Sequence, residues 1–230
     1  MIKLIGLLRR KEGMSIADFQ RYWREVHAPL IAAAPGLRRY IQSHAIEEVY
    51  DVYAQEWDGM AEAWFDDLAA YEAAAASDTW RAAGADSANF ISASARLFAQ
   101  EVPIIDAHPS PRERESMVKY AGLLTCKRGL TIEEMQEHWR TTHARLVVQS
   151  LPTMLRYIQC HALPESYAMQ PPPAYDGVPE AWFESLDTFP ERLGRPPEGP
   201  PTNPSSIDSY TIFEQPIPAI IAREVVIVDV

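Results

Sequence analysis

Two histidines occupy matching positions in a motif that the chain carries twice. His27 follows Trp23 by four residues, and His143 follows Trp139 by the same spacing. An imidazole with an unperturbed pKa of about 6.5 can take up and release protons at neutral pH, which suits general acid–base catalysis. The alternative role for His27 is structural, as a partly buried side chain that bonds a backbone carbonyl at the end of its helix.

A second set of polar side chains follows at alternate positions, Tyr40, Gln42 and His44. Alternate residues of a strand share one face, and a face with these groups is costly to bury in a dry core. Either they line a wet pocket, or they satisfy one another across a seam between sheets. In a pocket, Tyr40 could donate to a carbonyl or enolate oxygen and His44 could be a second acid–base group. The second half of the chain repeats the set as Tyr157, Gln159 and His161.

Other chemistries lack their sequence signatures. His138 and His143 would lie about 140° apart around a helix, so one metal ion could not easily bind both. The chain has no phosphate-binding loop, dinucleotide fingerprint or nucleophile elbow. Its two cysteines, Cys126 and Cys160, cannot form a disulfide framework or a zinc site unaided and are expected to be ordinary core or strand residues. The sequence therefore predicts neither a metal nor a cofactor.

The motifs recur because the chain is an internal duplication. Segment 3–8 returns as 119–124, and segment 39–44 returns as 156–161. A repeat of this length predicts two domain-sized units. A polar, proline-bearing stretch separates them. We predict a first repeat over 1–107, a linker over 108–116 and a second repeat over 117–230.

Each repeat is predicted to have the order β-α-β-β-α-β, the ferredoxin-like unit. Ser15 is expected to cap the first helix, and Pro29 and Pro35-Gly36 to end it. In the second repeat, a proline-rich insertion at 190–204 predicts a second helix that is short or replaced by a loop. The other expected elements of the first repeat are strands at 2–8, 37–44, 49–57 and 96–105 and a helix over 61–81.

Composition excludes several classes of protein. The chain has 32 acidic and 21 basic residues and a formal net charge of −11, which argues against binding to nucleic acid or to an anionic membrane surface. Hydrophobic residues make up 47% of the chain, but no apolar run reaches transmembrane length. The apolar segment 2–8 precedes the basic residues 9–11, which reverses the order of a signal peptide. We therefore expect a cytoplasmic protein.

The motif Trp23-x-x-x-His27-Ala28-Pro29, followed by 36–44, resembles the EthD family of dimeric α/β-barrel proteins. The segment 86–90 is similar to the second half of the domain that defines that family. The second copy departs from the pattern, with Arg145 in place of the proline and Ser206 aligned with Asp86. The resemblance implies an α+β fold in which two ferredoxin-like repeats pack into one eight-stranded barrel, here within a single chain.

The resemblance also implies a cofactor-free enzyme acting on a small apolar carbonyl or hydroxy compound, aromatic or polyketide-like. His27, His44 and Tyr40 would move protons in a decarboxylation, dehydration or isomerisation. One alternative is a cofactor-independent oxidoreductase or monooxygenase. Another is a non-catalytic accessory protein that binds a small hydrophobic molecule. Pairing of two fused barrels into a homodimer is left open.

The fuller motif of the first repeat predicts one competent pocket there. The inverse arrangement would use the proline-rich segment as a lid over a pocket in the second repeat. For the tryptophans that recur in both repeats, packing in the core is a more common role than forming the wall of a pocket. The residues expected to contact the substrate are Trp23, Gln42, Trp64 and Phe90.

Overall fold

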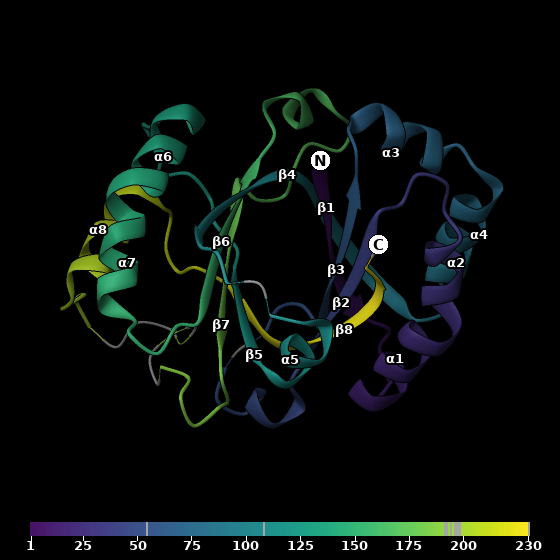
Figure 1. Ribbon diagram of the computed structural model, residues 1–230, viewed down its shortest axis with the longest axis horizontal. Coiled ribbons are helices and arrows are strands. Elements are labelled where there is room, and N and C mark those ends of the chain that lie inside the picture. Colours follow the sequence, from purple (N-terminus) through teal and green to yellow (C-terminus); the bar gives the residue numbers. More distant parts are fainter. Residues whose placement is uncertain (54, 108, 191–192, 194, 196–198, 230) are drawn as a thin grey trace.

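The computed structural model describes residues 1–53, 55–107, 109–190, 193, 195 and 199–229. Eight antiparallel strands close into one barrel in the order β1-β3-β2-β8-β5-β7-β6-β4 (Figure 1). The first repeat contributes β1 (Ile2–Arg10), β2 (Arg39–Ala45), β3 (Gly59–Phe65) and β4 (Ile91–Ile105). The second repeat contributes β5 (Val118–Gly122), β6 (Arg156–Ala162), β7 (Gly177–Phe183) and β8 (Ala219–Asp229).

The last strand of each repeat joins the two sheets. The first part of β4 pairs with β1, and its end, from Ala99 to Ile105, pairs with β6 of the other repeat. In the same way β8 pairs first with β5 and then with β2. Both seams are closed by these strands, so the barrel presents no free sheet edge. The structure thus confirms the predicted barrel of two ferredoxin-like units.

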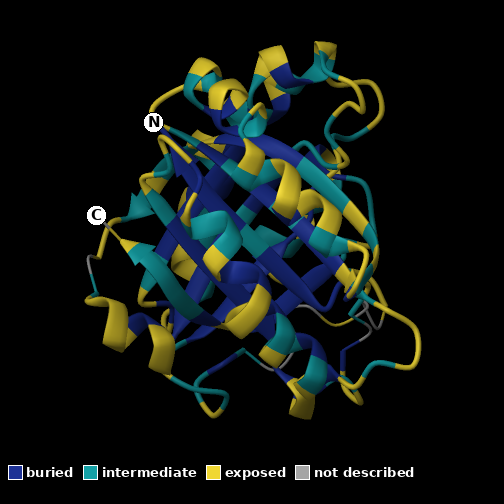
Figure 2. Cartoon of the chain, turned by 90° about the vertical axis from the view of Figure 1, so that its right-hand side faces the viewer, coloured by how far each residue is buried: buried dark blue, intermediate teal, exposed yellow. Residues whose placement is uncertain are grey.

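Helices cover the outside of the barrel on two opposite flanks (Figure 1), and the strands between them are mostly buried (Figure 2). As predicted, Ser15 caps the first helix, and its hydroxyl accepts from the amide of Asp18 at 3.1 Å. The first flank holds α1 (Ile16–Tyr22), a π-helical turn (Trp23–His27), α2 (Ala28–Ala32), α3 (Leu68–Ala75) and α4 (Asp78–Ser87). The second holds α6 (Ile132–His138), a π-helical turn (Trp139–His143), α7 (Ala144–Ser150) and α8 (Pro204–Ile212).

Two element predictions for the first repeat are wrong. The described residues of segment 49–57 form no strand. Val49 ends a short 3-10 turn (Glu47–Val49), and Val49 and Tyr53 pack against the second repeat. The helix expected over 61–81 begins only at Leu68, because 61–65 belong to β3. Along this strand Glu62 and Trp64 face the barrel interior while Phe65 packs under the helices, so both faces are buried and the alternation of a half-exposed strand is lost.

Pro29 does not end the first helical region, which continues to Ala32 and stops before Pro35-Gly36. In the preceding π-helical turn the amide of Ala28 bonds the carbonyl of Trp23, and Pro29, which has no N–H, then lies in the first turn of α2. The second repeat has the same π-helical turn although Arg145 replaces the proline. The widened turn therefore belongs to the repeat and is not caused by proline. Such turns often lie at functional sites.

The predicted linker contains a helix of its own. Within 108–116, α5 (Pro111–Ser116) begins at a capping box formed by Ser110 and Glu113, and its Arg114 is buried. The second helix of the second repeat is short, as expected. His108 and much of the proline-rich insertion, 191–192, 194 and 196–198, lie outside the described residues. No helix of the described ranges is both long and apolar enough to cross a membrane.

Gly59 and Gly177 allow a tryptophan to pack directly on the sheet. A Cβ at Gly59 would lie 2.4 Å from Cζ3 of Trp23, and one at Gly177 would lie 2.5 Å from Cζ3 of Trp139. We expect Gly59→Ala to lower the free energy of unfolding by roughly 1–3 kcal/mol, measured by urea denaturation, because the rigid indole must move. Gly84→Ala is the control, since Gly84 lies in α4 with open space around it and should gain up to about 1 kcal/mol. Equal effects of the two substitutions would contradict this packing argument.

Candidate functional site

His27 forms a hydrogen-bonded dyad with Asp86. Its ring ends the π-helical turn, and Asp86 lies in the last turn of α4, with Nδ1 of His27 2.9 Å from Oδ2 of Asp86. An ionised carboxylate can only accept, so Nδ1 carries the proton. Nε2 makes no hydrogen bond with any residue of the described ranges and is not among the buried polar atoms that lack a partner. This nitrogen is therefore the basic one, and it is not sealed in the core.

Neighbouring groups fix the dyad. Tyr22 donates to Oδ1 of Asp86 at 2.7 Å, and the side-chain amide of Asn89 donates to the same oxygen at 3.1 Å. The ring of Phe90 lies 4.8 Å from that of His27. Burial lowers the pKa of His27, and Asp86 only partly offsets it. The folded chain therefore holds His27 as neutral imidazole, the form that accepts a proton.

The second repeat builds the same dyad from a residue that the sequence alignment missed. Nδ1 of His143 lies 2.8 Å from Oδ2 of Asp208 in α8, so Asp208 and not Ser206 takes the place of Asp86. His138 contacts the other oxygen of Asp208 at 2.9 Å, where the first repeat uses a tyrosine. Phe213 packs near His143 as Phe90 packs near His27. The alignment failed because proline-rich chain replaces the first part of this helical region.

The polar side chains of β2 form hydrogen bonds with the helical segment that covers this strand. The indole N–H of Trp23 donates to the hydroxyl of Tyr40 at 3.2 Å, and the amide of Gln42 donates to the carbonyl of Trp23 at 3.1 Å. Since the amide nitrogen is fixed in this way, Oε1 of Gln42 accepts from Nε2 of His44 at 2.9 Å. The ring of His44 stacks on Trp23 at 4.8 Å. These groups therefore satisfy one another and Trp23, not partners across a seam.

Burial dominates the acid–base properties of this face. It raises the pKa of Tyr40 to about 12 and lowers the pKa of His44 to about 3. The second repeat has the same network, with Trp139 bonding Tyr157 at 3.2 Å and His161 bonding Gln159 at 2.9 Å. Burial raises the pKa of Tyr157 to about 12 and lowers that of His161 to about 4. Both networks are uncharged at neutral pH.

The structure divides the predicted site residues among three places. His27 and Phe90 lie together at the dyad. Trp23, Tyr40, Gln42 and His44 form the network between helix and sheet. Trp64 lies inside the barrel, 4.7 Å from the ammonium of Lys3. Sequence reasoning did not assign Tyr22, Asp86 or Asp208 to the site, although Asp86 had been noted in the family-like segment 86–90.

The barrel interior holds a cluster of buried charges that the sequence reasoning also missed. Lys3 contacts Glu180 at 2.6 Å and Glu62 at 2.7 Å, and Lys119 contacts the same two carboxylates at 3.4 and 2.7 Å. All four side chains are about 1% exposed. The available signal was the repeat itself, because each member has its counterpart at the matching position of the other repeat. We call Lys3, Lys119, Glu62 and Glu180 the interior quartet.

The two repeats differ in what else the quartet contacts. Ser43 donates to Glu62 at 2.6 Å, whereas the matching position beside Glu180 is Cys160. Burial raises the pKa of Glu180, and the neighbouring Glu62 carboxylate adds to the effect. Burial acts in the same direction on Glu62, but Lys119 and Lys3 outweigh it and lower its pKa. Of these two carboxyls, Glu180 is therefore the one that binds a proton more readily.

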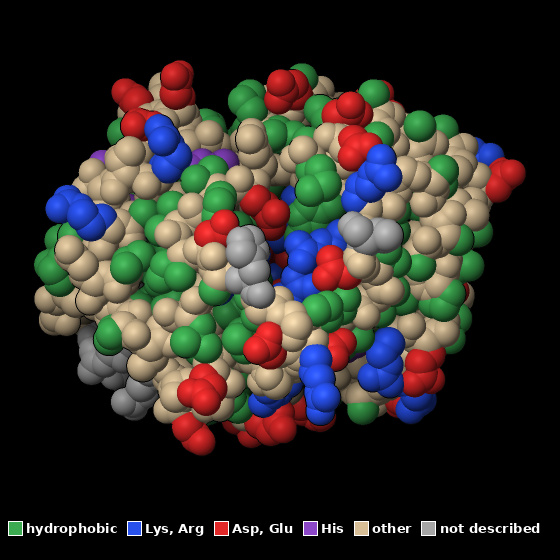
Figure 3. Space-filling view, viewed as in Figure 1, with side chains coloured by type: hydrophobic (Ala, Val, Ile, Leu, Met, Phe, Trp, Pro, Cys, Tyr) green, Lys and Arg blue, Asp and Glu red, His purple; other side chains and the backbone are tan. Residues whose placement is uncertain are grey.

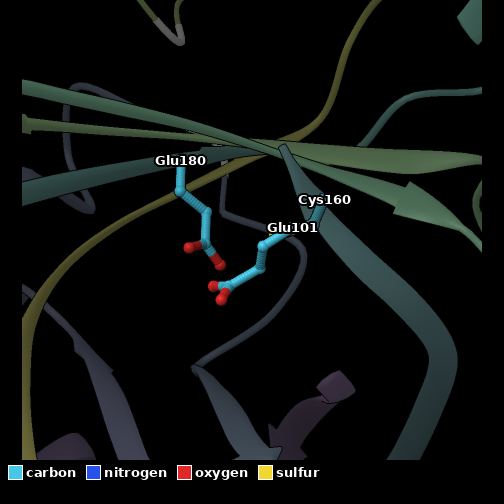
Figure 4. Close-up of side chains that lie close together, drawn as sticks. All are labelled: Glu101, Cys160 and Glu180. Carbon is cyan, nitrogen blue, oxygen red and sulfur yellow. The ribbon is translucent and has the colours of Figure 1, made fainter. Parts of the chain in front are cut away.

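Glu101, Cys160 and Glu180 have ligand atoms within 4.8 Å of one another, the spacing of a metal site (Figure 4). Lys3 already contacts all three, at 3.3 Å, 3.6 Å and 2.6 Å respectively. Its ammonium takes the place that a cation would occupy, and burial raises the pKa of the Cys160 thiol. This donor set fits the lysine better than a metal ion.

The fold is that of the dimeric α/β-barrel proteins, closed within one chain. The EthD domain model matches residues 11–94 and 127–196, one segment in each repeat, and the chain belongs to the EthD domain family.

Solved structures of similar fold include an anthrone oxidase-like protein, with TM-score 0.66, 8% identity and coverage of 97% of this chain and 91% of that one. A mutant chlorite dismutase from Candidatus Nitrospira defluvii gives TM-score 0.51, 8% identity and coverage of 98% and 92%. An EthD family protein from Bacillus halodurans C-125 is 25% identical over 44% of this chain and 99% of its own, with TM-score 0.39. No curated protein matches the sequence significantly.

Proposed function

We propose that the chain is an enzyme that transfers protons on a small apolar carbonyl or hydroxy compound, with the histidine of each dyad as the base. The observation that carries the proposal is the orientation of His27, whose Nδ1 is bonded to Asp86 at 2.9 Å while Nε2 has no partner among the residues that the structure describes. A carboxylate that orients an imidazole and stabilises its protonated form is the general arrangement of a catalytic base.

The reaction would begin with Nε2 taking a proton from a carbon next to the substrate carbonyl. The electron pair of that C–H bond moves toward the carbonyl oxygen, which becomes an enolate. Asp86 then stabilises the imidazolium, which returns a proton to the same or a neighbouring atom. Phe90 supplies an apolar surface beside His27, in keeping with an aromatic substrate. Isomerisation and dehydration can begin with such a step. Decarboxylation uses its second half, because loss of CO2 leaves an enolate that an imidazolium can protonate.

Both dyads are proposed to work. The first repeat alone was favoured because the second appeared to lack the proline, the aspartate and a regular second helix. Asp208 supplies the aspartate, and the π-helical turn forms without the proline. The two sites differ in one polar partner, since Tyr22 contacts the first aspartate and His138 the second. We therefore expect the two dyads to differ in rate and not in type of reaction.

The test is exchange of carbon-bound protons in D2O, followed by NMR, with phenylacetone and 2-hydroxyacetophenone as probes. We expect the double variant His27→Gln/His143→Gln to lose exchange by about 10²–10⁴-fold. Each single variant should retain the share of the other dyad. A wild-type chain that exchanges neither probe, or a double variant that exchanges both at the wild-type rate, would contradict the proposal.

His44→Gln in the same assay tests the strand face. Its Nε2 is bonded to Gln42, so we expect exchange to stay within a few-fold of wild type. A loss equal to that of the His27 variant would instead support the predicted role of His44 as a second catalytic group.

An oxidase is the second candidate function, suggested by the structural likeness to an anthrone oxidase-like protein. The two candidates differ in their use of oxygen. Proton transfer leaves dissolved oxygen constant during turnover, whereas an oxidase consumes it, so an oxygen electrode distinguishes them.

A further inference from the structure

One mouth of the barrel opens into a cavity of about 420 Å³ lined by three arginines from three elements. Arg39 begins β2, Arg156 begins β6, and Arg114 comes from the linker helix α5. In Figure 3 basic and acidic side chains gather at a hollow between the two helical flanks. The cavity lies on the interior face of the sheet, because Tyr40, next to Arg39, points to the helices. It is therefore separate from the dyads.

The two halves of the mouth contain matching arginines over matching tryptophans, but only one of these two arginines forms an ion pair. Arg39 lies over the ring of Trp64 at 5.0 Å, and its Nε is 2.9 Å from Asp229. Arg156 lies over the ring of Trp182 at 4.4 Å. Within the described ranges, however, Arg156 makes no ion pair. The Nε atoms of Arg39, Arg114 and Arg156 are all buried without a hydrogen bond, so the difference lies in the ion pairs that Arg39 and Arg114 form with Asp229.

The two halves also differ in how far their last strands are paired. Both seams have the same register shift, between Tyr40 and Ile41 in one and between Pro103 and Ile105 in the other. The pairing of β8 with β2 then continues to Asp229, opposite Arg39, whereas the pairing of β4 with β6 ends at Ile105, opposite Tyr157. The strand pairing thus places a carboxylate opposite Arg39 and none opposite Arg156.

The linker helix closes only one half. Arg114 is 3% exposed, pairs with Asp229 at 2.6 Å and lies 3.7 Å from Glu224. The Glu224 side chain is 2% exposed, whereas its counterpart Glu101 is 29% exposed. The half that contains Arg156 is therefore the one that a ligand can enter.

We propose that this cavity binds a small organic carboxylate, with its two oxygens paired to the guanidinium of Arg156. The planar fork of arginine matches a carboxylate in bidentate geometry, and a partly buried guanidinium without a partner is costly unless an anion satisfies it. Pro103 and Ile158 give the cavity an apolar wall, which suits a short hydrocarbon or aromatic skeleton on the carboxylate.

Titration calorimetry with benzoate tests the site, with benzamide as the uncharged analogue of the same shape. We expect benzoate to bind the full-length wild-type chain, and benzamide to bind at least tenfold more weakly. Arg156→Met should weaken benzoate at least tenfold, about 1.4 kcal/mol. Arg156→Lys keeps the charge but not the fork and should fall between the two.

Arg38→Met is the matched control, because Arg38 is exposed and paired with Asp66, and it should bind benzoate as wild type does. Circular dichroism identifies any variant that has not folded, and in that case the Arg156→Lys comparison decides. The proposal is overturned if wild type does not bind benzoate, if benzamide binds equally well, or if Arg156→Met and Arg156→Lys bind like wild type. Binding of inorganic phosphate with no binding of benzoate would overturn the assignment to a carboxylate.

Discussion

Lys119→Met lowers the free energy of unfolding by about 3–5 kcal/mol, the usual result when one partner of a buried charge network is removed. Its ammonium contacts Glu62 at 2.7 Å, Glu224 at 3.2 Å and Glu180 at 3.4 Å. Without it, Glu62 and Glu180 share the single ammonium of Lys3 inside the barrel. Urea denaturation at neutral pH measures the loss.

Lys127→Met is the matched control for this substitution. Lys127 pairs with Glu214 at 3.5 Å on the surface, where both side chains are more than a third exposed, so the change should cost less than about 1 kcal/mol. Adding Glu62→Gln to Lys119→Met removes one uncompensated charge and should restore part of the loss. A Lys119→Met chain as stable as the Lys127→Met chain would show that the interior quartet is not what stabilises the barrel.

The sequence was enough to predict the barrel, because the repeat is visible residue by residue and each half has the elements of a ferredoxin-like unit. It was not enough to place β3. Strand 59–65 is buried on both faces, by the barrel interior and by the helices, so its Trp64 and Phe65 fit a helical pattern as well as a strand pattern. The interior quartet was missed because charged residues inside a barrel contradict the rule that strands bury apolar side chains.

The candidate site was predictable only in part. His27 could be singled out because its residue type and recurrence suggest acid–base chemistry. Its partner could not be chosen from the sequence, because Asp86 lies 59 positions further on and only the packing of α4 against the π-helical turn brings the two together. In the second repeat the local alignment favoured Ser206, but the helical geometry of α8 presents Asp208. The difference between Arg39 and Arg156 likewise depends on how far each last strand stays paired, which no local pattern reveals.

Acidification from pH 7 to pH 5 destabilises the fold, and His44 and His161 are expected to contribute most of the effect. Burial lowers their pKa values to about 3 and about 4, whereas the unfolded chain binds the same protons at about 6.5. The unfolded state therefore holds more protons below pH 6.5. The contribution of these two histidines to the free energy of unfolding is complete above that pH. It falls by about 1.4 kcal/mol per pH unit for each group as the pH decreases.

Other groups with shifted pKa values also change the stability of the fold between pH 7 and pH 5. Burial also lowers the pKa values of His27 and His143, which adds to the loss on acidification. The raised pKa of Glu180 acts in the opposite sense, because that carboxyl binds a proton in the folded chain before it does so in the unfolded one. Three or more histidine protons oppose one carboxyl proton, so the net slope keeps the sign set by the histidines.

The readout is the slope of unfolding free energy against pH in urea titrations at pH 7, 6 and 5, which separates titration from lost packing. His44→Gln/His161→Gln will be less stable than wild type at pH 7, because both rings stack on tryptophans. Its slope below pH 6.5 should nevertheless be shallower. If the double variant and wild type lose stability in parallel down to pH 5, the acid sensitivity lies elsewhere and these two imidazoles are protonated in the folded chain.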